Sequence, residues 1–191
     1  MTTLPDWMNP PRPEGWFAED LDSLPEAPRH TELIDGALVF MMSPQRNWHR
    51  RVISQLDRIL REQAPAGFEA NSEMTVRLDD RNRPEPDAVV STASLGPDAT
   101  CYEAADVVLA VEVVSPESEH RVLTVKPHKY AAAGIKHFWR IEDEDGNAST
   151  VVHVYELDGM TRTYAPVGIF RETLKVERPF PVELDVQTLY S

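Results

Sequence analysis

Residues 106–115 read Asp-Val-Val-Leu-Ala-Val-Glu-Val-Val-Ser, and this stretch decides the fold class. From Val107 to Val114 every residue except Glu112 is apolar, and most are β-branched. The run is too short for a typical helix and is characteristic of a central strand covered on both faces. An unpaired carboxylate buried in such a strand would cost several kcal/mol. Glu112 must therefore be protonated, paired or bound to a cation.

The segments around this strand predict two helices and a hairpin. Residues 31–41 predict a hairpin that turns at Asp35-Gly36. Residues 44–63 predict a helix, with Ser43 and Pro44 suited to its cap and first position. Its apolar face is Trp48, His49, Val52, Ile53, Leu56, Ile59 and Leu60. A second helix is predicted from Lys126 to Gly134.

The remaining pattern is that of a mixed sheet. Further strands are predicted at 68–78, 87–91, 136–142, 151–156, 161–165 and 172–176. The order of helix, strands, helix, strands predicts an α/β protein with a mixed sheet flanked by helices and additional strands toward the C-terminus. Residues 1–30 predict a proline-rich, acidic lead-in with one short helix, followed by a single domain over 31–191.

Composition narrows the function classes. The chain has 191 residues and a net charge of −13, which argues against coating nucleic acid through a broad basic surface. The single cysteine, Cys101, excludes an internal disulfide. No signal peptide and no membrane-spanning run are recognised, so we expect a soluble, cytoplasmic protein.

Three polar residues carry the candidate chemistry. Asp87 begins a predicted strand after two prolines, and on a strand next to that of Glu112 it would complete a two-carboxylate pocket for Mg²⁺. Lys126, at the expected start of the second helix, could reach back to position a water or offset phosphate charge. The competing interpretation is that Glu112 forms a structural ion pair.

An ordered set of motifs resembles a known family. Glu32-Leu-Ile-Asp-Gly36, Pro86-Asp87, Glu112-Val-Val-Ser-Pro116 and Lys126-x-x-x-Tyr130-x-x-x-Gly134 follow one another along the chain. Together they resemble the Uma-type family of restriction endonucleases, within the PD-(D/E)XK nuclease superfamily. The resemblance spans roughly residues 16–142.

The resemblance implies a restriction-endonuclease-like core and Mg²⁺-dependent hydrolysis of phosphodiester bonds, with Mn²⁺ as a substitute. Asp87, Glu112 and the backbone carbonyl of Val113 would hold the metal. The superfamily lysine lies two residues beyond the acid, where this chain has Val114, and Lys126 fits the family's displaced lysine. Relatives carry an aspartate four residues before that lysine, whereas this chain has Val122, which could reduce activity.

Other polar residues have two interpretations each. Glu32 could add a carboxylate to the site or could be an exposed hairpin residue beside Arg29. His49 is expected to be a buried structural histidine rather than a catalytic one. Tyr130 is expected to pack on the sheet with its hydroxyl at the pocket rim.

The polar face of the first helix is the one basic concentration in the sequence. It carries Arg46, Arg50, Arg51, Arg58 and Arg61, of which Arg46, Arg50 and Arg58 are the candidate phosphate contacts. The alternative is an ordinary solvated helix surface.

Three functions remain open from the sequence. The first is a metal-dependent endonuclease expected to act on DNA, as a homodimer because two-fold symmetry suits a duplex. The second is a catalytically weak nuclease-fold module that binds nucleic acid or protein. The third is a metal-free hydrolase that uses Asp87 and Glu112 on a sugar, for which no cluster of aromatic residues is apparent.

Overall fold

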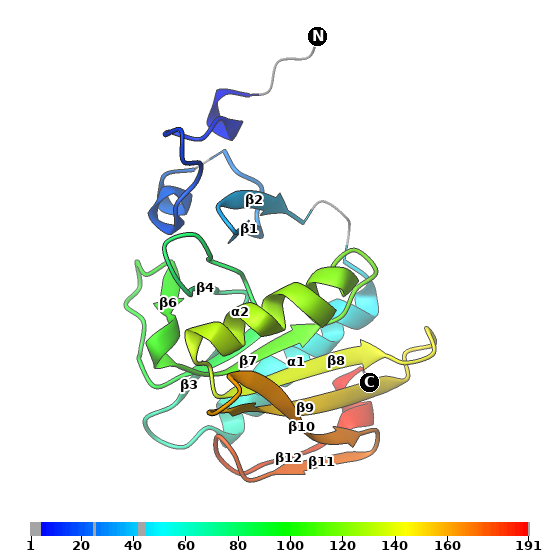
Figure 1. Cartoon of the computed structure of the whole chain (residues 1–191). Coiled ribbons are helices and arrows are strands. Elements are labelled where there is room, and N and C mark those ends of the chain that lie inside the picture. The colour runs from blue at the N-terminus through cyan, green and yellow to red at the C-terminus, as the bar shows by residue number, and fades with distance from the viewer. Residues whose placement is uncertain (1–4, 25, 42–44, 191) are drawn as a thin grey trace.

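A computed structural model describes residues 5–24, 26–41 and 45–190. Its centre is a sheet of six strands in the order β10-β9-β8-β7-β5-β3 (Figure 1). The strands β7 and β8 are parallel and the other neighbours are antiparallel. Their bounds are β3 Glu69–Ser72, β5 Ala88–Ser91, β7 Val107–Val113, β8 His137–Asp143, β9 Thr150–Asp158 and β10 Thr163–Phe170.

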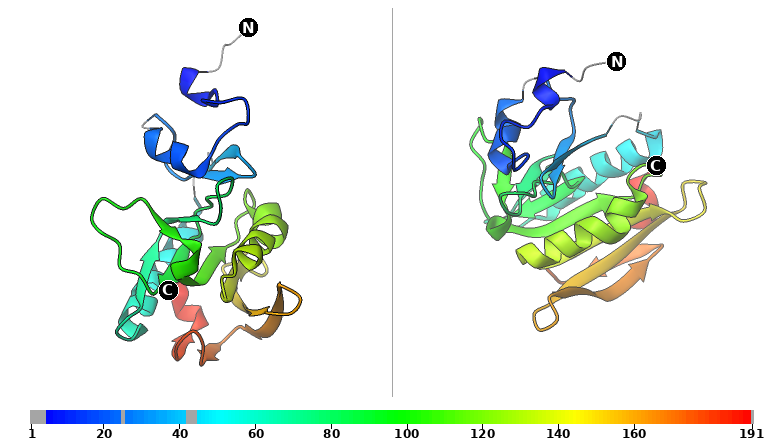
Figure 2. Two further views of the ribbon diagram at one scale, coloured as in Figure 1. Left: turned by 60° about the vertical axis from the view of Figure 1, so that its left-hand side comes forward. Right: turned by 45° about the horizontal axis from the view of Figure 1, so that its top comes forward.

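Two helices cover opposite faces of this sheet, as the views in Figures 1 and 2 show. The first, α1, spans Asn47–Gln63, and the second, α2, spans Lys126–Ala133. Leu109, Val111 and Val113 of β7 belong to the core beneath α1, whereas Ala110 belongs to the core beneath α2. The period-2 alternation of a strand therefore turns Glu112 toward α2. The prediction of a central strand covered on both sides is confirmed.

The predicted hairpin is formed by β1 (Thr31–Ile34) and β2 (Ala37–Phe40), paired in antiparallel register. Asp35 and Gly36 both have positive φ, 51° and 74°, as a tight two-residue hairpin turn requires. A bridge between Leu33 and Arg83 joins this hairpin to the segment before β5.

Short elements complete the chain. A parallel pair is formed by β4 (Thr75–Arg77) and β6 (Cys101–Glu103). An antiparallel pair near the C-terminus is formed by β11 (Thr173–Val176) and β12 (Val182–Asp185), so the predicted C-terminal strands are confirmed. Among the described residues, 3₁₀ turns span Asp6–Met8, Ala18–Ser23, Ala104–Asp106 and Val186–Leu189.

The predicted start of the first helix is wrong. The helix begins at Asn47 rather than Pro44, because Arg46 is extended, with ψ of 145°, and acts as the N-cap without a side-chain cap. The guanidinium of Arg46 instead binds Asp143 of β8 at 3.0 Å, a distant contact that local capping rules do not contain. The proposed cap, Ser43 and Pro44, lies outside the described residues. The predicted apolar face is confirmed at all seven positions.

The predicted start of the second helix at Lys126 is confirmed for α2, although α2 does not begin from a loop. A π-helical turn at Arg121–Val125 runs directly into α2, so Lys126 lies within a longer helical segment. Its N–H bonds to the carbonyl of Arg121, five residues back. Pro127 has no N–H to donate, and a π turn accommodates such a break in the α-helical ladder. Gly134 ends the helix in the left-handed region, with φ of 86°, as predicted.

Two predicted strands have different bounds. The strand expected at 68–78 is divided into β3 and β4, because Glu73 between them has a φ of 54°. The strand expected at 161–165 extends to Phe170 through a bulge at Pro166 and Gly168. Within the described ranges, no helix is both long and apolar enough to cross a membrane.

Candidate metal and active site

Asp87 and Glu112 come together on neighbouring strands. The antiparallel register that pairs Ala88 of β5 with Val111 of β7 brings Asp87 beside Glu112. The N–H of Val113 donates to Oδ2 of Asp87 at 2.6 Å, which fixes the carboxylate at the end of the sheet. The expected juxtaposition of the two acids is thus present in the structure.

Glu112 is buried and its two oxygens are both bound. Its residue exposure is 2%. The Nζ of Lys126 lies 2.9 Å from Oε1 and 3.0 Å from Oε2. The hydroxyl of Tyr130 donates to Oε1 at 2.6 Å. Because Lys126 and Tyr130 are four residues apart on the same helical face, both reach the carboxylate from α2. The expected position of the Tyr130 hydroxyl at the pocket rim is wrong, because this residue is fully buried.

Lys126 also binds the N-terminal hairpin. Its Nζ lies 2.6 Å from Oε1 of Glu32 and donates to the carbonyl of Glu85 at 3.1 Å. Glu32 is 2% exposed, so the alternative of an exposed hairpin residue is wrong. The second oxygen of Glu32, Oε2, is buried and has no hydrogen-bond partner among the described residues.

Burial and mutual repulsion change the proton affinity of this cluster. Burial raises the pKa of Asp87 to about 7, against the charge of Lys126, which lowers it. Burial likewise raises the pKa of Glu112 to about 8, with Lys126 opposing and Asp87 and Glu32 adding to the rise. Burial lowers the pKa of Lys126, but the charges of Glu112 and Glu32 outweigh it and the net pKa is raised. The ammonium of Lys126 therefore stays charged. It does not balance all of the neighbouring carboxyl groups, so these favour binding of a proton or a cation.

His49 contacts the expected metal ligands from the opposite side. Its Nε2–H donates to the carbonyl of Val113 at 3.0 Å and lies 3.6 Å from Oδ1 of Asp87. Burial lowers the pKa of His49, which favours the neutral ring. The predicted buried, hydrogen-bonded histidine is confirmed, and its partner is the very carbonyl expected to face a metal. A carbonyl oxygen has two lone pairs, so one remains for a cation.

Two further residues belong to the site and were not recognised in the sequence. Glu85 accepts a hydrogen bond from His30 at 2.5 Å, and its own N–H donates to Glu32 at 2.8 Å. Burial raises the pKa of Glu85, although the bond from His30 lowers it. The one available signal was the alternation of Glu85 with Asp87 in Arg-Pro-Glu-Pro-Asp, which places both on one side of an extended segment.

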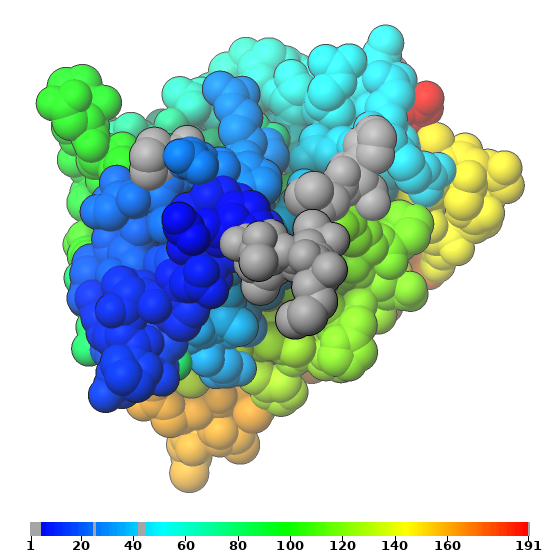
Figure 3. Space-filling model, turned by 90° about the horizontal axis from the view of Figure 1, so that it is seen from above, coloured from blue at the N-terminus to red at the C-terminus, as the bar shows by residue number. Residues whose placement is uncertain are grey.

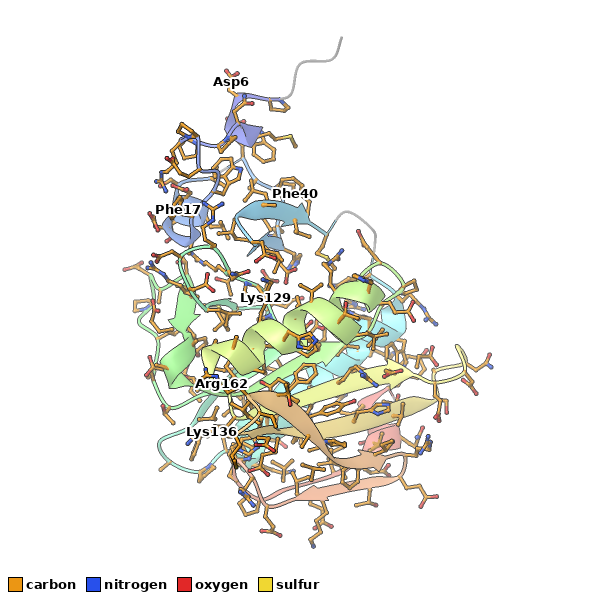
Figure 4. All side chains as sticks on the ribbon, in the orientation of Figure 1. Asp6, Phe17, Phe40, Lys129, Lys136 and Arg162 are labelled. Atoms are coloured by element: carbon orange, nitrogen blue, oxygen red, sulfur yellow. The ribbon has the colours of Figure 1, made fainter. Side chains whose placement is uncertain are left out.

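These residues line a cavity of about 500 Å³. The hairpin side of the cavity includes His30, Glu32 and Met41, and the opposite side includes the start of α1 and the turn after β7. In the view from above (Figure 3), residues near the N-terminus cover much of the upper face of the molecule, beside the residues of α1 and α2. Figure 4 shows Lys129 on the hairpin side of α2, where its Nζ binds Asp35 at 2.6 Å.

The candidate arginines divide into two groups. Arg46 and Arg50 line the cavity at the start of α1. Arg58 lies two to three helical turns farther along, where it binds Glu62 at 2.8 Å and Gln55 at 3.0 Å. Val122, which replaces the family's aspartate, is fully buried and is not among the cavity-lining residues.

The donor set fits a hard divalent cation. Within the described ranges, no three His, Cys, Asp or Glu side chains already converge as metal ligands. Mg²⁺ needs fewer, because it binds one or two carboxylates and keeps several waters. Glu32, Glu85, Asp87 and Glu112 line one cavity with a single lysine, and one oxygen of Glu32 has no partner. This excess of buried oxygen ligands suits a cation of that type.

Comparison with known proteins agrees with the fold. The model of a family described as "Uma2: Putative restriction endonuclease" matches residues 18–188. A crystal structure from Anabaena variabilis, described as "a putative nuclease belonging to DUF820", aligns with a TM-score of 0.67 and 19% sequence identity. The alignment covers 90% of this chain and 96% of that one. Among curated proteins, none matches the chain.

Proposed function

The chain belongs to the Uma2 family of restriction endonucleases, and from this premise we propose that it is a Mg²⁺-dependent endonuclease that hydrolyses phosphodiester bonds in DNA. The single observation that carries the proposal is the buried Glu112, held by Lys126 beside Asp87 in one cavity. A perturbed carboxylate pair with a lysine in a cavity is a typical functional constellation.

Asp87, Glu112 and the free lone pair of the Val113 carbonyl are the residues that would hold Mg²⁺ or Mn²⁺. When bound, the cation polarises a phosphate oxygen and lowers the pKa of a bound water. In hydrolysis the attacking water loses a proton to solvent and its oxygen forms a bond to phosphorus, while the bond from phosphorus to the leaving oxygen breaks and that oxygen takes a proton from solvent to become the new hydroxyl. Both acids act as ligands in the ionised form, which a neighbouring cation favours.

Lys126 and Tyr130 orient the ligands in this proposal. Lys126 favours the charged form of Glu112 and holds its carboxylate in place, with the ammonium near where the phosphate would lie. The hydroxyl of Tyr130 donates a hydrogen bond to the same carboxylate and so restrains its orientation. Glu32 restrains Lys126 from the hairpin, so the N-terminal segment contributes to the geometry of the site.

The direct test is cleavage of plasmid and oligonucleotide DNA with Mg²⁺ or Mn²⁺. We expect the wild type to cut and Glu112→Gln to lose cutting while it keeps the circular dichroism spectrum of the wild type. Glu172→Gln is a matched control, because Glu172 is exposed and remote from the cavity. Persistent cutting by Glu112→Gln would overturn the assigned role.

A non-catalytic binding module is the second candidate. It is favoured by one observation: both oxygens of Glu112 already have partners in Lys126 and Tyr130, as in a structural ion pair. Titration calorimetry with Mg²⁺ separates the two. Binding of Mg²⁺ by the wild type that is lost in Asp87→Asn supports the nuclease. Affinity for DNA without any binding of a divalent cation supports the non-catalytic binding module.

The homodimer stays a prediction. The argument for it is the two-fold symmetry of a duplex cut on both strands, and that argument does not apply to a substrate that is an unpaired strand. Sedimentation at several protein concentrations checks it, with a monomer at every concentration as the contradicting result.

A further inference from the structure

The candidate catalytic groups lie at the bottom of a recess. Glu32 and Glu112 are each 2% exposed and Lys126 is 4% exposed. One wall of the recess is the hairpin, and the opposite wall is the start of α1 with the turn at Ser115 and Ser118. A phosphate that reacts there must come close to Asp87 and Glu112. A cavity of about 500 Å³ is of the size that takes a ligand of drug-like dimensions, not the body of a double helix.

The basic rim of this recess is short. Arg46 and Arg50 are one helical turn apart at the cavity mouth. Arg58 and Arg61 are occupied by acids one turn away on the same helix, Glu62 and Asp57. Arg46 is likewise bound to an acid, Asp143, at 3.0 Å, so what distinguishes Arg46 and Arg50 is that they line the cavity whereas Arg58 and Arg61 do not. Phosphate contacts at the cavity are therefore confined to one turn, which spans one or two phosphates of a strand rather than a duplex track.

The net charge of the whole chain also disfavours a duplex substrate. At a net charge of −13, a long stretch of duplex that lies against the body meets repulsion, because duplex DNA carries one charge per about 1.7 Å of its axis. A single strand has a lower charge density, is flexible and can insert one nucleotide at a time.

We propose that the cavity takes an unpaired DNA strand, such as a single strand, overhang or flap, and not the interior of an intact duplex. This inference rests on the proposed function and names its substrate class. Rotation about the backbone of an unpaired strand lets one phosphate descend between the hairpin and α1, while Arg46 and Arg50 contact the phosphates at the mouth. The described residues of the cavity wall include no Phe, Tyr or Trp, so the strand is held by its backbone more than by base stacking. Six of the lining residues are acidic, so a phosphate enters only when a bound cation offsets their charge.

The test compares three end-labelled DNA probes of one sequence with Mg²⁺: a single strand, a blunt duplex, and a duplex that carries a single-stranded overhang. We expect cutting of the single strand and the overhang roughly tenfold or more faster than cutting within the duplex. Cutting of the duplex interior at the rate of the single strand overturns the inference and leaves the nuclease intact.

A binding measurement separates this inference from the proposed function. Fluorescence anisotropy with Ca²⁺, which oxygen ligands also bind, reports affinity for the same probes without relying on turnover. A preference for the single strand without any cutting contradicts the nuclease but supports the substrate class. Equal affinity for single strand and duplex contradicts the substrate class whether or not DNA is cut.

The arginine variants test the short rim. With about two phosphate contacts, log K for the single strand should fall with log[salt] at a slope of about −1.4. Arg50→Ala should reduce this slope by about 0.7, whereas Arg178→Ala, a matched control on a remote ion pair with Glu156, should leave it unchanged. Arg58→Ala distinguishes the interpretations: an unchanged slope supports the short rim, and a slope reduced as much as in Arg50→Ala overturns it in favour of a track along α1.

Discussion

Lys126 is the residue on which the buried charges depend. Its ammonium contacts both Glu112 and Glu32, and removal of one partner of a buried pair leaves an uncompensated charge. We expect Lys126→Met to lower the free energy of unfolding by about 3 kcal/mol, measured by urea denaturation. The double variant Lys126→Met, Glu112→Gln should recover part of this loss, because one of the stranded carboxylates is then neutral. Additive losses in the double variant would contradict the coupling.

Asp87 should make the stability of the metal-free protein fall as pH rises. Its folded pKa of about 7 lies above the usual pKa of an aspartate, 3.8, so the folded state binds more protons between these values. Stability is then greatest below that range and is lost as pH rises through the folded pKa. We expect the Tm in EDTA to fall between about pH 4 and pH 7, and to fall less in Asp87→Asn. The exposed Asp98→Asn is the control, and an equal pH slope in Asp87→Asn contradicts the assignment.

At the same scale, the sequence pointed to Glu112 because a charge in an apolar strand is visible in the pattern, whereas Asp87 and Lys126 were proposed from their places at the starts of a strand and a helix and from the family motifs. Glu112 interrupts an apolar strand, and that signal is local. The partners of Glu112 were harder to predict from the sequence. Tyr130 was read as a rim residue because the depth of a side chain depends on how α2 packs on β7, which the sequence of neither element contains. Glu85 and His30 meet across 55 positions in the chain, with no periodicity to link them.

The hairpin is the element that brings Glu32 to the site, and Gly36 makes its turn possible. Gly36 has a φ of 74°, and a Cβ there would lie 2.0 Å from Nη2 of Arg81. The guanidinium of Arg81 also lies over the ring of Phe17, so it cannot move aside without loss of that contact.

Gly36→Ala should therefore cost more than its conformational strain. Gly67 is the matched control, because its φ is also positive, at 92°, and nothing lies within 4 Å of a Cβ there. We expect Gly36→Ala to lower the free energy of unfolding by about 1 kcal/mol more than Gly67→Ala. Equal losses by urea denaturation would show that the contact with Arg81 is unimportant.

The elements also show where sequence patterns fail. The buried face of α1 was predicted at every position, because a helix with 3.6 residues per turn that packs on a sheet repeats its apolar residues with that period. Its start was misplaced because Arg46 binds Asp143, which lies ninety-seven positions away in the sequence. The π-helical turn before Lys126 has no simple local signature, although Pro127 marks where an α-helical bond is missing.

The whole molecule combines an acidic surface with an acidic cavity, so divalent cations should stabilise it specifically. A ligand that binds the folded state adds RT ln(1 + [L]/Kd), about 2.7 kcal/mol at one hundred times Kd. For a domain of this size the expected rise in Tm is about 5–10 °C with saturating Mg²⁺. Ionic strength must be matched with KCl, because a net charge of −13 is screened by any salt.

Variants distinguish the cavity from the surface in this measurement. If Mg²⁺ binds between Asp87 and Glu112, Asp87→Asn should lose most of the rise in Tm, whereas Asp98→Asn on the surface should keep it. Because Asp87→Asn also removes one repelling charge from the cluster, its Tm in EDTA at pH 8 should lie above that of the wild type. The carboxylate of Asp87 would then lower the stability of the protein without a cation and raise it when Mg²⁺ is bound. This is the behaviour expected of a residue whose role is to bind a cation rather than to support folding. A rise in Tm that is the same in wild type and Asp87→Asn would place the cation on the acidic surface instead.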